Sequence, residues 1–74
     1  MDRMKQEYQR MMQAIDKYEK GELKMMATYR VIRDAEKSLL ELANNDRVQK
    51  SIIRLLIKTM RLKVREIKWN KVIG

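Results

Sequence analysis

Apolar and aromatic side chains recur along residues 1–43 at intervals of three and four, the spacing that places them on one face of an α-helix. Glu22 and Glu36 interrupt this row, which consists of Met1, Met4, Tyr8, Met11, Ile15, Tyr18, Met25, Tyr29, Ile32 and Leu39. The row crosses Gly21, and no Ser, Thr, Asp or Asn directly follows that glycine to start a new helix. Two arrangements stay open: residues 1–43 form one long or kinked helix, or two helices folded back on each other.

The clearest boundary in the chain is the tripeptide Asn44-Asn45-Asp46. Asparagine tolerates the left-handed conformation that ends a helix. Asp46 can cap the next helix, with Gln49 three residues later completing a capping box. We therefore predict a tight turn here, in an all-α antiparallel bundle with helical segments at 3–19, 22–43 and 47–69, the first two continuous or separate.

The last segment carries an unusually wide apolar face. At about 100° per residue, its apolar side chains cover about 220° of the helix surface. They are Val48, Ile52, Ile53, Leu55, Leu56, Ile57, Met60, Leu62, Val64 and Ile67. Such a face needs neighbours on two or three sides, which predicts a three-helix bundle or a dimeric four-helix arrangement. We expect the dimer, because a core from 74 residues without cysteines supplies only about 3–5 kcal/mol.

The chain is expected to be a single domain over residues 1–74. Residues 1–43 would provide the scaffold and the self-association surface, and residues 46–74 the basic helix. Tyr8, Tyr18 and Tyr29 share the spacing of the apolar row and are expected to pack in or beside the core. Met12 and Met26 lie off that row, so they are either gap fillers or contacts to a partner protein.

The net charge of +8 is concentrated in the last third of the chain. Residues 1–45 hold nine cations and eight acids, whereas residues 46–74 hold nine cations and two acids. Seven of these cations fall within an arc of about 80° on the last helix. We call them the basic stripe: Arg47, Lys50, Arg54, Lys58, Arg61, Arg65 and Lys68. The polar face of the preceding segment instead alternates in sign, with Arg30, Asp34, Lys37 and Glu41.

A one-sign face about 32 Å long predicts an anionic partner. The leading hypothesis is a small regulatory or accessory protein that binds a DNA or RNA backbone through the basic stripe. The alternative is a modulator or inhibitor, of bacterial or phage type, that docks on an acidic protein surface. Trp69, at the edge of the stripe, is expected to anchor the bundle end or to contact a partner.

Catalysis is not expected, because the chain has no histidine, no cysteine and no glycine-rich phosphate loop. No metal or cofactor is expected for the same reason. No window of 18 apolar residues occurs, so a membrane span is not expected. Docking of the last helix on a membrane surface is a minor alternative. The charged start, without an apolar signal segment, favours a cytoplasmic protein.

Overall fold

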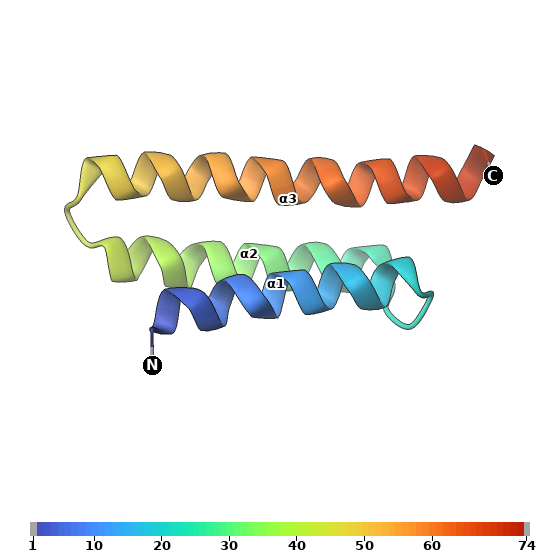
Figure 1. Cartoon of the computed structure of the whole chain (residues 1–74), viewed down its shortest axis with the longest axis horizontal. Coiled ribbons are helices and arrows are strands. Elements are labelled where there is room, and N and C mark those ends of the chain that lie inside the picture. The colour runs from blue at the N-terminus through green and yellow to red at the C-terminus, as the bar shows by residue number, and fades with distance from the viewer. Residues whose placement is uncertain (1, 74) are drawn as a thin grey trace.

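The computed structural model describes residues 2–73, and they form an all-α bundle (Figure 1). The helices are α1 (Arg3–Glu19), α2 (Met25–Ala43) and α3 (Arg47–Ile73). Successive helices run in opposite directions, and α2 contacts both of the others more extensively than these contact each other. The predicted all-α antiparallel bundle is confirmed. Dimerisation stays a prediction.

The chain reverses at Gly21, which resolves the alternative that the sequence leaves open. Gly21 adopts a left-handed φ of +81°, which residues with a Cβ rarely adopt. The Gly21 N–H donates to the Tyr18 carbonyl at 3.0 Å and the Glu22 N–H to the Lys17 carbonyl at 2.8 Å. This pair of bonds is the Schellman motif that ends helices. Residues 20–24 form the connection, so α2 begins at Met25 rather than at the predicted residue 22.

Replacing Gly21 by alanine is expected to destabilise the fold by about 1 kcal/mol, because alanine is strained at positive φ. A Cβ at this position would meet nothing within 4 Å, so no steric clash adds to the backbone term. Urea unfolding followed by circular dichroism measures the change. An unchanged unfolding midpoint would contradict the conformational role given to Gly21.

The turn at residues 44–46 is confirmed, with one detail different. Asn44 has a φ of 56°, and the Asp46 carboxylate accepts from the Gln49 N–H at 3.0 Å. The Asp46 N–H donates to the Ala43 carbonyl at 3.1 Å, so it closes the turn instead of meeting the Gln49 side chain. The cap is therefore one-sided rather than a capping box. With no breaker after Trp69, α3 continues to Ile73 instead of ending at residue 69.

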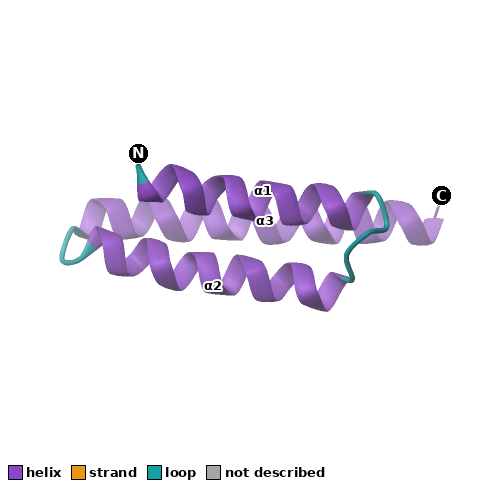
Figure 2. Cartoon of the chain, turned by 90° about the horizontal axis from the view of Figure 1, so that it is seen from below, coloured by secondary structure: helices purple, strands orange, loops and turns teal. Residues whose placement is uncertain are grey.

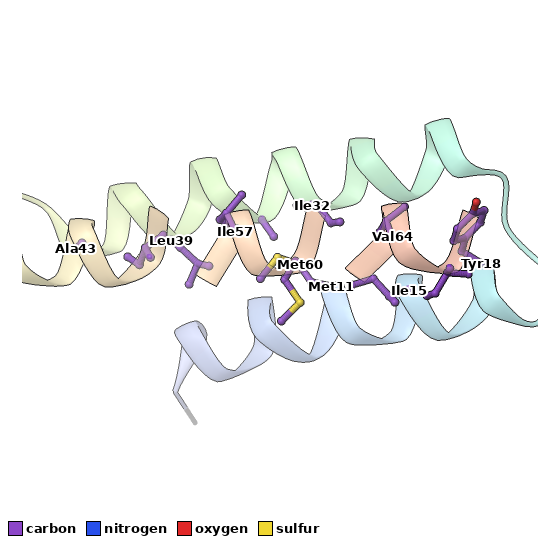
Figure 3. Close-up of a cluster of buried hydrophobic side chains, with 12 residues drawn as sticks. Met11, Ile15, Tyr18, Ile32, Leu39, Ala43, Ile57, Met60 and Val64 are labelled. Atoms are coloured by element: carbon purple, nitrogen blue, oxygen red, sulfur yellow. The ribbon is translucent and has the colours of Figure 1, made fainter. Parts of the chain in front are cut away.

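The core lies where the apolar faces of the helices meet (Figure 3). Its buried side chains are Met11, Ile15 and Tyr18 from α1, Ile32, Ala35, Leu39 and Ala43 from α2, and Ile53, Ile57, Met60, Val64 and Ile67 from α3. Thr28 is buried among them, and its hydroxyl donates to the Lys24 carbonyl at 3.0 Å. The tyrosine prediction holds for Tyr18 and for half-buried Tyr29. Tyr8 is 41% exposed and lies outside the core, so for it packing beside the core stays a prediction.

The long helix α3 extends past the α1–α2 turn at its C-terminal end (Figures 1 and 2). Its 27 residues span about 40 Å, close to the 43 Å long axis of the molecule. Lys71 connects this end of α3 to α1, since its Nζ donates to the Tyr18 carbonyl and lies 4.3 Å from the centre of the Tyr18 ring. Among the described residues, no helix is both long enough and apolar enough to cross a lipid bilayer.

Candidate nucleic-acid interface

All seven residues of the basic stripe lie on α3, which runs unbroken from Arg47 to Ile73. Six of the seven side chains are exposed, and Lys50 is half-buried. Because α3 has no break, the stripe keeps a regular spacing along about 32 Å. The stripe is therefore a rigid row of cations facing water, as its periodicity predicts.

The stripe runs beside α2. Arg61 lies 3.6 Å from the carboxylate of Glu36 on α2, and both side chains are partly exposed. A pair of this kind contributes little to stability. The contact does show which edge of α3 faces α2. Within residues 2–73, Arg61 is the one member of the stripe with an acid within ion-pair distance.

Open depressions follow the seam between α2 and α3, and three of them share the half-buried side chain of Tyr29. Seven cations and one acid, Glu36, line these three. We call this surface the basic groove; its cations are Arg30, Arg33, Arg54, Lys58, Arg61, Arg65 and Lys68. The basic groove is thus wider than the stripe, because α2 contributes to it.

Sequence reasoning missed the α2 side of the basic groove. Tyr29, Arg33 and Glu36 share one face of α2 by their spacing, which the sequence does contain. That this face lies against the stripe depends on the rotation of α2 relative to α3. Only the packed structure gives that rotation. Tyr29 therefore places an aromatic ring among the cations, where the sequence pattern had indicated none.

The other charged surfaces are mixed in sign. Arg30, Asp34, Lys37 and Glu41 are all exposed on α2, as predicted, and of these four Arg30 also lines the basic groove. On α1, Arg10 pairs with Glu7 at 3.5 Å. At the end of that helix, Lys20 pairs with Asp16 at 3.0 Å. The one-sign character is therefore specific to the α3 side of the bundle, where repulsion among neighbouring cations costs a few tenths of a kcal/mol per pair.

The three residues predicted as partner contacts lie in different surroundings. Met12 is half-buried and packs against the core, which favours gap filling over a partner contact. Met26 is 69% exposed and lines the basic groove beside Arg30. Trp69 is 65% exposed beside Lys68, so it does not cover the end of the bundle as an anchor would.

Within residues 2–73, no three His, Cys, Asp or Glu side chains come together in a way that could hold a metal ion. Compared with family models, curated proteins and solved structures, the chain shows no significant similarity to any of them. Function is therefore inferred from the surface of the chain itself.

Proposed function

We propose that the chain binds the sugar–phosphate backbone of a nucleic acid through the basic groove. The observation that carries this proposal is the positive charge of the groove, which is lined by seven cations and one acid. The other charged faces of the bundle carry both signs of charge. Phosphates supply most of the affinity in sequence-independent binding, because each neutralised phosphate releases condensed counterions. A straight row of long, exposed Lys and Arg side chains suits that task.

Reading of bases is not part of the proposal. Gln49 and Asn70, which could meet base edges, lie on sides of α3 away from the stripe by their helical positions. Tyr29 is half-buried and lines the groove among the cations. A ring in that position favours stacking on an unpaired base over specific readout. The expected mode is backbone binding with little sequence preference.

The test is a binding titration of labelled duplex DNA, single-stranded DNA and RNA over a range of salt concentrations. If the groove neutralises about four phosphates, log K on the duplex falls with log salt at a slope of about −3.5. Two duplexes of unrelated sequence are expected to give the same curve. Affinity that hardly changes with salt, or no binding at low salt, would contradict the proposal.

A second candidate function is docking on an acidic surface of another protein. Exposed apolar side chains beside the cations favour it, since Leu62 and Trp69 adjoin Arg65. Cations would steer the encounter and the apolar side chains would supply the contact. Affinity capture from a nuclease-treated lysate separates the two functions. A stoichiometric protein retained after nuclease treatment favours the second, and loss of all bound material favours the first.

A further inference from the structure

The helix α3 carries a second apolar row that its own chain does not cover. Residues 48, 55, 62 and 69 repeat at intervals of seven and are all apolar: Val48, Leu55, Leu62 and Trp69. Ile52, Thr59 and Glu66 come between them and Ile73 after them, so that the steps alternate between four and three. We call these eight positions the heptad row. Its apolar members are 50–70% exposed.

The bundle uses the other side of α3. Its buried side chains lie on average about 150° around the helix from the heptad row, and Ile57 and Val64 lie almost opposite to it. In Figure 1, α1 and α2 lie on one side of α3, and no other helix or turn of residues 2–73 lies on the opposite side. About half of the wide apolar arc of α3 is therefore covered within the monomer. The two halves of the arc meet at half-buried Leu56, and the basic stripe occupies the opposite side of the helix.

The sequence predicts a self-association surface within residues 1–43. We propose instead that the heptad row of α3 is the docking surface for a second copy of the chain, which pairs antiparallel through its own heptad row. Steps of four and three are the repeat by which two helices interlock side chains along their length. The row spans residues 48–73, or about 38 Å. If the interface covers half the circumference of a helix about 10 Å across over that length, each copy buries about 600 Å². The total buried area of about 1,200 Å² is at the lower end of the range for stable interfaces.

The charges in and beside the row favour the antiparallel orientation. A parallel pair would set Glu66 against Glu66 of the second copy and Lys58 beside its Lys63. Both contacts join like charges. An antiparallel pair that overlaps over residues 48–73 brings Glu66 opposite Leu55 of the second copy, one turn from its Lys58. The single acid of α3 then meets a cation instead of another acid.

The antiparallel pairing also brings the two basic stripes to the same side of the dimer. Lys58 of one copy comes beside Arg65 of the other, and repulsion between them opposes association. Salt screens that repulsion and leaves the apolar contact intact. Dimerisation is therefore expected to strengthen with salt, the opposite of nucleic-acid binding. The proposal rests on the heptad row alone and does not depend on the proposed function.

The first test is sedimentation equilibrium of the full chain, from about 5 to about 300 µM, at low and high salt. The expected result is a monomer–dimer equilibrium whose dissociation constant falls as salt rises. Replacing Leu55 and Leu62 together by glutamate is expected to raise that constant at least about 100-fold, because both carboxylates would be buried. Met26→Glu is the matched control. Met26 is equally exposed but lies on α2, so its variant should dimerise normally.

The second test reads orientation and does not depend on the stability of the variants. The chain has no cysteine, so introduced ones report on contacts directly. A mixture of Leu55→Cys and Glu66→Cys chains is expected to form mixed disulfides faster than either chain forms its own. Faster self-linking of Leu55→Cys would overturn the antiparallel pairing. If the chain is a monomer at every protein and salt concentration, the heptad row does not bind a second copy. An acidic helix of another protein would then be the remaining occupant.

Discussion

Charge reversal of Arg47, Arg54 and Lys68 together is expected to weaken duplex binding at least about 100-fold at low salt. All three are exposed members of the basic stripe, and Arg54 and Lys68 also line the basic groove. Each reversal removes a phosphate contact and adds a repulsive charge, so the slope of log K against log salt should also become shallower. Labelled duplex in a binding titration measures both effects.

The three positions are chosen to leave the Arg61–Glu36 ion pair and the heptad row of α3 unchanged. Arg61 is left unchanged, because a glutamate there would face Glu36, its present partner at 3.6 Å. Lys58 and Arg65 are left unchanged because they flank the heptad row. Glu at residue 54 would gain Lys50 and Lys58 as neighbours at i−4 and i+4. Helicity is therefore expected to stay close to that of the original chain, and dimerisation should not weaken.

The matched control places the same reversals on α1, at Arg3, Lys5 and Lys17, all exposed and away from the basic groove. Both variants lower the net charge from +8 to +2, since each reversal changes it by two units. If net charge alone drove binding, the two variants would lose affinity equally. Equal loss would remove the basic groove as the binding surface. A large difference would assign the affinity to α3.

The parts of the fold that the sequence predicts are those that local chemistry decides. The left-handed Asn44 and the Asp46 cap act within four residues, so the turn between α2 and α3 could be placed from residue types. The stripe could be placed for a similar reason, because the rise and turn of one helix fix the face of each side chain. Gly21 is the intermediate case, since a reversal and a kink both use a flexible residue.

What the sequence could not predict depends on how helices are rotated against each other. Ile52 and Ile53 are adjacent and chemically identical, yet one is 61% exposed and the other 6%. Both lie in the predicted apolar arc, and only packing against α2 divides that arc into a covered and a free half. The same rotation brings Tyr29 and Arg33 beside the stripe. A single sequence contains the pattern of each helix but not the angle between them.

Two isoleucines of α3 give the sharpest test of this division. Ile57→Ala is expected to cost about 2–5 kcal/mol, because Ile57 is 2% exposed and its loss leaves a cavity between α2 and α3. A bundle of this size has about 3–5 kcal/mol in total, so the variant should lose most of its stability at 25 °C. Ile52→Ala makes the same chemical change, with the same gain in helix propensity, at an exposed position. In dilute solution it should leave the unfolding midpoint almost unchanged.

Concentration then separates the core from the heptad row. If two copies associate, the melting temperature of the original chain rises with protein concentration, because only folded chains can form the dimer. Ile52→Ala should match the original chain when dilute and fall behind it as concentration rises, since it removes a contact that exists only between copies. Ile57→Ala should be destabilised at every concentration. Thermal melts of the three proteins over a hundredfold concentration range measure these differences. If Ile52→Ala were as unstable as Ile57→Ala in dilute solution, the heptad row would be buried within one chain.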